Sequence, residues 1–207
     1  MLTNANKWAM ASRNRIFCTT FALYRKKMRY EITAPKKFDA TITLPASKSI
    51  SNRALVIHAL SYGNIMPRHL SDCDDTEVMV NALRDMPDTI DIKAAGTAMR
   101  FLTAYLSVAE GEEHVITGTE RMKHRPIAIL VDALRYLGAD ISYEGEEGYP
   151  PLRIKGKALE GGHLEITGSV SSQYISALLM IGPALKNGLE LKMTGNIASR
   201  PYIDLTL

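Results

Sequence analysis

Cysteine and tryptophan are scarce in this sequence, and long apolar runs are absent. The 207 residues include one tryptophan and two cysteines, Cys18 and Cys73, whose spacing indicates neither a disulfide framework nor a cysteine-based metal site. The five histidines show no HxH or HxxxH spacing, so no histidine metal site is indicated. No stretch approaches the roughly 18 apolar residues of a membrane-spanning helix. We therefore expect a cytoplasmic protein with no membrane segment.

Acidic residues are missing from the first part of the chain. Six of the 25 Lys and Arg residues precede Met28 and no Asp or Glu does, so the rest carries 19 basic and 22 acidic residues. The formal net charge of +3 is thus an effect of one end and does not indicate a nucleic-acid-binding face. Residues 1–27 fit an organellar transit peptide, a disordered basic arm, or translated sequence upstream of a true start at Met28. The third interpretation is favoured, because 1–27 show no packing pattern.

The most informative stretch is residues 44–63, LPASKSISNRALVIHALSYG. Pro45 and Gly63 bracket a polar cluster that opens an apolar helical pattern. Ser47, Ser49 or Ser51 can cap this helix. Lys48 then lies beside the free N–H groups at the positive end of the helix dipole, and Arg53 lies about one turn further on. The stretch therefore predicts an anion site.

The same arrangement recurs along the chain. Small or polar clusters open apolar helices that end near a glycine at residues 47–63, 95–111 and 168–182. Residues 76–84 and 127–135 match each other as a second kind of helix, and a third copy begins at 201–205. Alternating or short apolar segments predict strands at residues 30–33, 38–44, 114–117, 140–143, 152–154, 163–166 and 189–193.

These elements predict an α/β (α+β) fold built from repeated βαβαββ units. A single unit cannot bury its helices, so we expect about three units to pack with the helices inside and the sheets outside. The last unit is incomplete, because the sequence stops after its second helix begins.

Six motifs carry a family resemblance, and they occur in order along the chain. The first, SKSISNRA at residues 47–54, resembles the N-terminal signature of the 5-enolpyruvylshikimate-3-phosphate synthases (EPSP synthases). The resemblance extends over residues 30–207. The other five motifs are AGTAMRFLTAYL (95–106), RMKHRPI (121–127), LVDALRYLGADI (130–141), GSVSSQYISALLM (168–180) and SRPYIDLTL (199–207).

The resemblance implies two sets of site residues and one catalytic group. Shikimate 3-phosphate would be held by Lys48, Ser49, Arg53, Ser171, Ser172, Gln173, Ser199 and Tyr202. Phosphoenolpyruvate would be held by Lys48, Gly96, Arg125 and Gln173. Lys48, which would lie between the two anions, is the implied catalytic residue. Metal ligands, metals and organic cofactors are not implied.

The implied reaction transfers the carboxyvinyl group of phosphoenolpyruvate to the 5-hydroxyl of shikimate 3-phosphate and releases phosphate, a transferase step of the shikimate pathway in aromatic amino acid biosynthesis. Residues 28–45 would hold strands that partly belong to a second lobe, and residues 46–207 would form the lobe that binds shikimate 3-phosphate. We expect a fragment of a protein about twice as long, monomeric when complete. The fragment alone is expected to be inactive, because the sequence offers no convincing acid or base.

Two residues depart from the family pattern, and two other functions remain open. Ala94 stands where the family commonly has Asn, and Phe101 where it has Pro, so sensitivity to the inhibitor glyphosate is in doubt. The sister enzyme that uses a UDP-sugar shares the fold but lacks the SKSxSNRA signature. The remaining alternative is a non-catalytic phosphate-binding or interaction lobe with a regulatory role.

Overall fold

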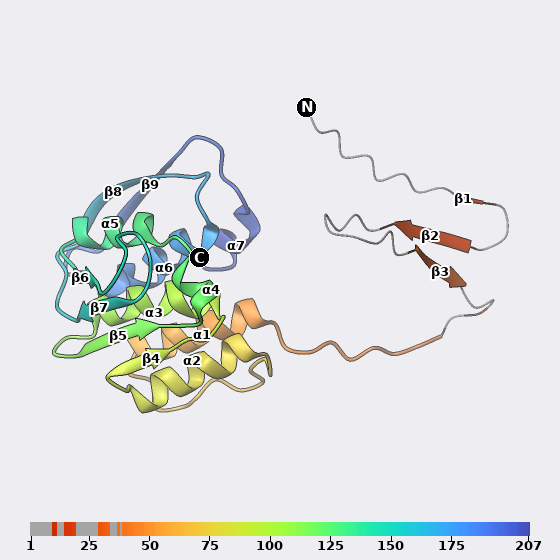
Figure 1. Cartoon of the computed structure of the whole chain (residues 1–207), viewed down its shortest axis with the longest axis horizontal. Coiled ribbons are helices and arrows are strands. Elements are labelled where there is room, and N and C mark those ends of the chain that lie inside the picture. Colours follow the sequence, from red (N-terminus) through yellow and green to blue (C-terminus); the bar gives the residue numbers. More distant parts are fainter. Residues whose placement is uncertain (1–9, 12–14, 20–28, 34–36, 38) are drawn as a thin grey trace. The chain divides into compact units, whose positions relative to one another are not determined.

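The protein is described by a computed structural model that covers residues 10–11, 15–19, 29–33, 37 and 39–207 (Figure 1). The chain divides into two compact units, residues 1–44 and residues 45–207, and each is described by itself. None of the helices in the described residues is long and apolar enough to cross a membrane.

The first unit contains an antiparallel sheet of three strands. Its order is β1 (Met10–Ala11), β2 (Arg15–Thr19) and β3 (Arg29–Thr33), and Phe17 of β2 lies opposite Glu31 of β3. β3 confirms the strand predicted at residues 30–33. Residues 1–9, 12–14 and 20–27 lie outside the described residues, so the three interpretations of residues 1–27 stay predictions.

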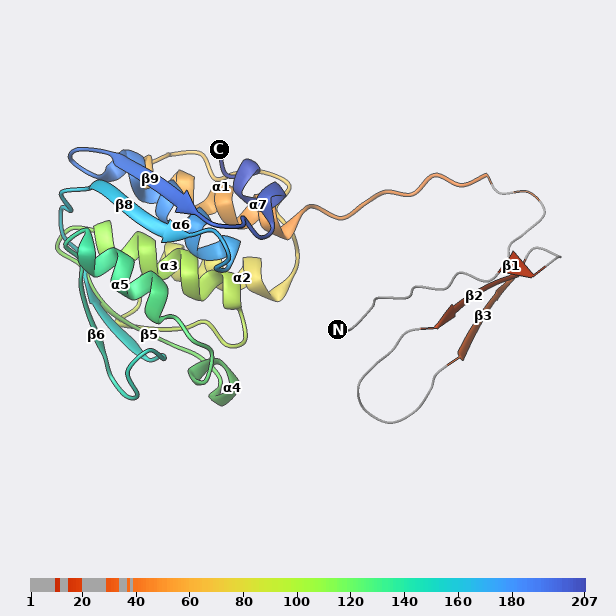
Figure 2. The same ribbon diagram turned by 90° about the horizontal axis from the view of Figure 1, so that it is seen from above.

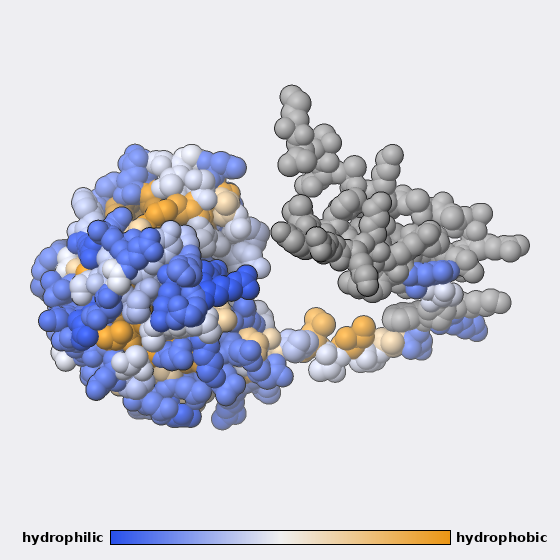
Figure 3. Space-filling model, viewed as in Figure 1, coloured by the Kyte–Doolittle hydropathy of each residue, from blue (hydrophilic) through white to orange (hydrophobic). Residues whose placement is uncertain are grey.

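The strand predicted at residues 38–44 is wrong for the residues that the structure describes. Phe38 lies outside them, and residues 39–44 have no regular structure. Ile42 and Leu44 are 71% and 81% exposed, and Figure 3 shows hydrophobic residues in orange at the surface of this segment. The alternating pattern identified a potential strand, but no described strand pairs with it. An unpaired strand leaves its backbone groups to water.

The second unit holds all the helices that the described residues form. They are α1 (Lys48–Leu60), α2 (Asp74–Asp85), α3 (Gly96–Val108), α4 (Glu120–Lys123), α5 (Ala128–Tyr136), α6 (Ser172–Ile181), the 3-10 turn η1 (Gly182–Ala184) and α7 (Arg200–Asp204). The predicted helices are confirmed within a few residues at each end. α1 begins directly after its cap, Ser47, and stops three residues before Gly63. The short helix α4 was not predicted.

One complete βαβαββ unit runs from residue 89 to residue 155, with the short helix α4 as an addition. Its strands are β4 (Thr89–Asp91), β5 (Glu113–Thr117), β6 (Asp140–Tyr143) and β7 (Leu152–Lys155), in the sheet order β4-β5-β7-β6. β4 pairs with β5 in parallel, and β7 pairs antiparallel with both β5 and β6. β4 was not predicted, because three residues are too few to show a period. The predicted repeat unit is thereby confirmed.

A second copy of the unit is present in part. β8 (Gly162–Thr167) and β9 (Leu189–Thr194) pair in parallel across α6, and α7 follows. The sequence order is therefore β8-α6-β9-α7, which is the first two thirds of the pattern. The predicted α/β class with an incomplete last unit is confirmed.

The core lies around α3, which is buried on almost every side. Eleven of its 13 residues are buried, among them Phe101 and Leu102. Figures 1 and 2 show α3 and α6 between the β8–β9 pair and the sheet of β4 to β7. α5 buries only one face, with Leu130 and Leu134 inside and Ile129 half exposed. The prediction of inner helices and outer sheets therefore holds for α3 and α6, whereas α5 lies at the surface.

Candidate functional site

Three helices start at the same end of the second unit. The guanidinium of Arg53 in α1 lies 5.3 Å from the ring centroid of Phe101 in α3, and its Nη2 donates to Ser176 Oγ in α6 at 2.8 Å. Each of these residues lies four or five positions after the first residue of its helix. Because the second turns meet, the three N-terminal ends lie together.

These N-terminal ends attract anions. Ser47 Oγ accepts from the Ile50 N–H at 3.4 Å, and Ser171 Oγ accepts from the Gln173 N–H at 3.3 Å. The start of α3 at Ala95 has no side-chain cap, and none of the three helices carries an acid in its first turn. The positive ends of the helix dipoles are therefore not neutralised by carboxylates of their own helices.

The loop before α3 is fixed by short contacts. The Lys93 N–H donates to Asp91 Oδ1 at 2.8 Å, and the Thr119 N–H donates to the Lys93 carbonyl at 3.0 Å. A Cβ at Gly118 would lie 2.5 Å from that carbonyl oxygen, so glycine is needed for the approach. The start of α3 is thereby held in place beside the segment that carries α4.

Gly96, the first residue of α3, makes room for Arg125. A Cβ at Gly96 would overlap the Arg125 Nη1 atom and lie 2.9 Å from its Cζ. The missing side chain therefore lets the exposed guanidinium of Arg125 lie against the start of the helix. Two residues that are distant in sequence and were both predicted to bind phosphoenolpyruvate are in this way brought together.

A buried arginine and a tyrosine hold the segment next to Arg125. Arg100 Nη2 and the Tyr174 hydroxyl both donate to the Pro126 carbonyl, at 3.0 and 2.7 Å, and Arg100 Nη1 donates to the Gly96 carbonyl at 3.1 Å. Burial lowers the pKa of Arg100, and the neighbouring charge of Arg125 lowers it further. Arg100 thus links the start of α3 to the segment that positions Arg125.

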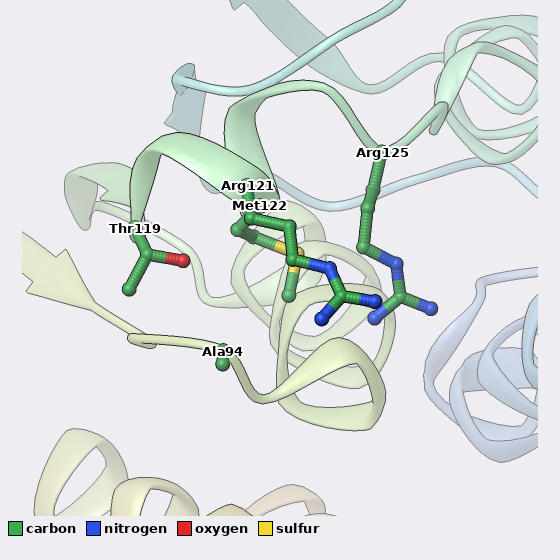
Figure 4. Close-up of a pocket in the computed structure, with 5 residues that line it drawn as sticks. All are labelled: Ala94, Thr119, Arg121, Met122 and Arg125. Atoms are coloured by element: carbon green, nitrogen blue, oxygen red, sulfur yellow. The ribbon is translucent and has the colours of Figure 1, made fainter. Parts of the chain in front are cut away.

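A pocket of about 350 Å³ opens above the start of α3 (Figure 4). Its lining residues are Ala94, Thr119, Arg121, Met122 and Arg125. Figure 4 shows the guanidinium groups of Arg121 and Arg125 side by side, above the loop that holds Ala94. Residue 94 contributes only a methyl group, so the space next to the two arginines is open.

The start of α6 adjoins the start of α3. Gln173 Nε2 donates to Thr97 Oγ1 at 3.2 Å, which joins the two helix ends directly. Ser171 is exposed and Ser172 is partly exposed at the same end. Gln173 therefore lies next to the pair of Gly96 and Arg125, and the two serine hydroxyls are open to solvent or to a ligand.

Lys48 lies at the first position of α1. Its Nζ is 3.5 Å from Asp75 Oδ1 of α2, with the lysine side chain 46% exposed and the aspartate side chain 22% exposed. The pair leaves the ammonium group accessible. Among the described residues, Asp75 is the carboxylate that forms an ion pair with Lys48. Asp75 belongs to α2, a helix that was not predicted to contribute to the site.

Arg53 is used differently from the other predicted site residues. It is 5% exposed, and its guanidinium donates to the Ser49 carbonyl, Thr206 Oγ1, Ser176 Oγ and the Tyr202 carbonyl at 2.7–3.0 Å. Burial lowers its pKa. Four of its five N–H donors are thus occupied by the protein, and Arg53 ties α1 to α6 and to the residues around α7.

The last two predicted residues lie beside α7. Ser199 is exposed and precedes the helix in a left-handed conformation, with φ of 54°. The Tyr202 side chain is 50% exposed, whereas its carbonyl accepts from Arg53. Neither side chain is joined by a hydrogen bond to another predicted site residue within the described part of the chain.

The predicted residues thus form one close group and several separate members. Gly96, Arg125 and Gln173 gather at the start of α3. Within the described residues, the side chains of Lys48, Ser199 and Tyr202 make no hydrogen bond or ion pair with these three. The sequence reasoning missed Arg100, Arg121 and Tyr174. Arg121 was visible within the motif RMKHRPI, but only the folded structure reveals its position in the pocket.

Comparisons with known proteins agree on one family. The sequence profile of EPSP synthase (3-phosphoshikimate 1-carboxyvinyltransferase) matches residues 32–91 and 85–207. A 3-phosphoshikimate 1-carboxyvinyltransferase of Bacteroides fragilis is 67% identical over 180 residues, which are 87% of this chain and 44% of that protein. One of Haemophilus influenzae is 43% identical over 197 residues, which are 82% of this chain and 46% of that protein. The chain therefore spans less than half the length of these curated relatives.

The fold has a solved counterpart. An EPSP synthase structure from Acinetobacter baumannii superposes with a TM-score of 0.64 at 24% identity, covering 79% of this chain and 42% of that chain. At this identity the match supports the fold alone.

Proposed function

This chain belongs to the EPSP synthase family, and on that basis we propose that the protein it forms part of transfers the carboxyvinyl group of phosphoenolpyruvate to the 5-hydroxyl of shikimate 3-phosphate. The observation that carries the proposal is the common end of α1, α3 and α6, where Arg125 and Gln173 gather around Gly96. Two anionic substrates need such an excess of positive charge and N–H donors.

We propose that Ser171, Ser172 and Ser199 hold the phosphate of shikimate 3-phosphate and that Tyr202 packs on its ring. Lys48, Ser49, Arg53 and Gln173 complete this set. The exposed hydroxyls at the start of α6 support it. Arg53 acts here mainly by position, because four of its donors already bind the protein.

Phosphoenolpyruvate is assigned to Lys48, Gly96, Arg125 and Gln173. The guanidinium of Arg125 offers a planar fork to phosphate oxygens, and the ammonium group of Lys48 supplies a compact charge between the two anions. Gly96 keeps the start of α3 open, so that backbone N–H groups and the arginine can reach the same oxygen atoms.

The chemistry proceeds by addition and elimination. The 5-oxygen bonds to C2 of phosphoenolpyruvate while its proton leaves and another proton reaches the methylene carbon, which gives a tetrahedral adduct. Loss of phosphate and of a methyl proton then restores the double bond. Lys48 and Arg125 stabilise the phosphate charge as the carbon–oxygen bond breaks. None of the proposed site residues of this chain is a carboxylate, so the proton transfers need groups from the rest of the protein.

We further propose that the complete protein is a cytoplasmic monomer with these two small molecules as partners, and that it uses neither cofactor, nucleic acid nor membrane. Residues 46–207 would form the lobe that binds shikimate 3-phosphate, and the strands of residues 28–45 would partly belong to a second lobe. Closure of two lobes would bring proton-transfer groups to the substrates.

The test is turnover by the complete protein. With both substrates, we expect phosphate release and a new enol ether product detected by NMR. The turnover rate should drop by about 100-fold or more in Lys48→Ala, because the ammonium group that stabilises the charge on the departing phosphate is lost. Lys123→Ala, which removes a lysine paired with Glu120, is the matched control and should keep its rate. Absence of turnover, or phosphate release that needs no shikimate 3-phosphate, would refute the proposal.

A further inference from the structure

We infer that Arg121 is a second phosphate-binding residue at the start of α3, and that it acts together with Arg125 as a two-arginine clamp on the phosphate group of phosphoenolpyruvate. This inference rests on the proposed function for the identity of the ligand. The geometry behind it is the pocket of about 350 Å³ that both arginines line above Ala94 (Figure 4).

The first observation is that neither guanidinium is neutralised. Within the described residues, no carboxylate lies within ion-pair distance of Arg121 or Arg125, and neither guanidinium donates a hydrogen bond to the protein. The acid nearest in sequence, Glu120, accepts instead from Lys123 Nζ at 2.8 Å. Two like charges that share one pocket repel each other, so the arrangement gains most from an anion between them.

The second observation concerns what surrounds the pair. The start of α3 lies below them with no side-chain cap and no acid in its first turn. The buried Arg100 adds a third positive charge near Arg125. The local field is therefore positive on several sides, which matches a dianion better than a singly charged group.

The number of guanidinium groups in the pocket indicates which anion fits it. One guanidinium satisfies the two oxygens of a carboxylate in a bidentate pair. Two guanidinium groups and a helix N-terminus together match a phosphate, which has three terminal oxygens and close to two negative charges. The pocket thus favours the phosphate end of phosphoenolpyruvate over its carboxylate end.

Ala94 makes the contribution of Arg121 possible. A longer polar residue at position 94 would occupy the pocket wall and could donate to the same phosphate. Here the methyl group of Ala94 leaves that space open, and Figure 4 shows that the Arg121 guanidinium points into the same pocket. A charged donor therefore replaces a neutral one, so this chain need not bind phosphoenolpyruvate more weakly for lack of a side-chain amide.

The test is an NMR titration of the ¹⁵N-labelled chain at constant ionic strength, followed at the amides of Gly96, Thr97 and Ala98. The probes are phosphoenolpyruvate, inorganic phosphate and pyruvate, which lacks the phosphate. Arg121→Gln is expected to weaken binding of the first two probes by about tenfold or more, as the loss of a charge-assisted hydrogen bond requires. It should leave the weak response to pyruvate unchanged.

Lys123→Gln is the matched control. It also removes one positive charge, two residues after Arg121, but Lys123 is already paired with Glu120. Arg125→Gln should weaken the phosphate-bearing probes like Arg121→Gln. Arg121→Gln behaving like Lys123→Gln would overturn the inference, and so would an unmodified chain whose amides do not respond to millimolar phosphoenolpyruvate.

These failures are separate from failure of the proposed function. A chain that binds phosphoenolpyruvate through Arg125 alone loses the inference and keeps the function. A chain that binds it through both arginines, in a protein that shows no carboxyvinyl transfer, keeps the phosphate clamp and loses the function.

Discussion

Arg53 makes four hydrogen bonds with one guanidinium, and this changes how the segment SKSISNRA is understood. Its neighbours are also structural: Ser51 Oγ accepts from the Ser71 N–H at 2.9 Å, and Asn52 Oδ1 accepts from Thr76 Oγ1 at 2.8 Å. Only the first half of the segment, with Lys48, is left accessible for a ligand. The motif therefore combines the proposed anion site with hydrogen bonds that hold the loop before α2, α2 itself and α6 to α1.

Arg53→Ala is expected to destabilise the chain by about 3 kcal/mol or more, because it removes four hydrogen bonds and the packing of a buried guanidinium at once. The measurement is urea unfolding followed by circular dichroism. Arg125→Ala, which removes an exposed guanidinium, should change the free energy of unfolding by no more than about 0.5 kcal/mol. Equal stability of the two variants would contradict the structural role of Arg53.

Gly96→Ala is expected to keep the fold and weaken phosphoenolpyruvate binding. The new Cβ meets the far end of the Arg125 side chain, which is exposed and can move, so the free energy of unfolding should change by less than about 1 kcal/mol. The Arg125 guanidinium would then lie away from the start of α3, where it is proposed to bind the phosphate oxygens. Unfolding and phosphoenolpyruvate titrations check both parts, and unchanged affinity would show that the position of Arg125 does not matter.

Tyr174→Phe removes one of the two donors to the Pro126 carbonyl. Arg100 still donates to that oxygen, so we expect a loss of about 0.5–1.5 kcal/mol rather than unfolding. Denaturant unfolding measures it, with Tyr136→Phe at a 73% exposed tyrosine as the control. A loss in the control as large as in Tyr174→Phe would mean that the bond to Pro126 contributes nothing measurable.

Elements of the second unit were predictable where they are long and periodic. α3 and α6 showed continuous apolar runs, and α2 and α5 showed one apolar face each. β4 has three residues and α4 has four, which is too short for a period to appear. Residues 38–44 failed for another reason: alternation indicates a strand, but pairing depends on a partner that the described residues do not provide.

Pairs of opposite charge join three strands of the β4 to β7 sheet. Arg153 of β7 pairs with Glu113 of β5 at 3.0 Å and with Glu144, which follows β6. The hydrogen bond from Arg153 holds the pKa of Glu113 below its ordinary value of 4.5, with a smaller contribution from the charge of Lys155. Because the folded pKa is the lower one, the stabilisation is complete above the ordinary value and is lost as pH falls through the folded value.

The unmodified chain should therefore exceed Glu113→Gln in free energy of unfolding at neutral pH, and this difference should shrink as the pH falls to about 3. The effect is small, because the pair is exposed and salt screens it. Urea unfolding at several pH values, at low and high salt, measures it. A difference that stays constant with pH would show that the carboxylate charge of Glu113 is not involved.

At the scale of the whole molecule, the sequence predicted the fold class and the repeated unit, because the same kind of helix start recurs three times along the chain. It could not predict which side chains turn inward. Arg53 and Arg125 look equivalent in sequence, yet one is buried beneath Phe101 and the other is exposed beside Gly96. Tertiary contacts decide this, and so they also revealed Arg121.

We propose that the common end of α1, α3 and α6 binds shikimate 3-phosphate with Lys48 as a necessary cation. Isothermal titration of shikimate 3-phosphate into the chain of residues 1–207, into Lys48→Ala and into Lys123→Ala tests it most directly. We predict measurable binding that Lys48→Ala abolishes and Lys123→Ala retains. Equal affinity of the unmodified chain and Lys48→Ala, or a folded chain that binds no shikimate 3-phosphate, would show that this end of the three helices is not the binding site.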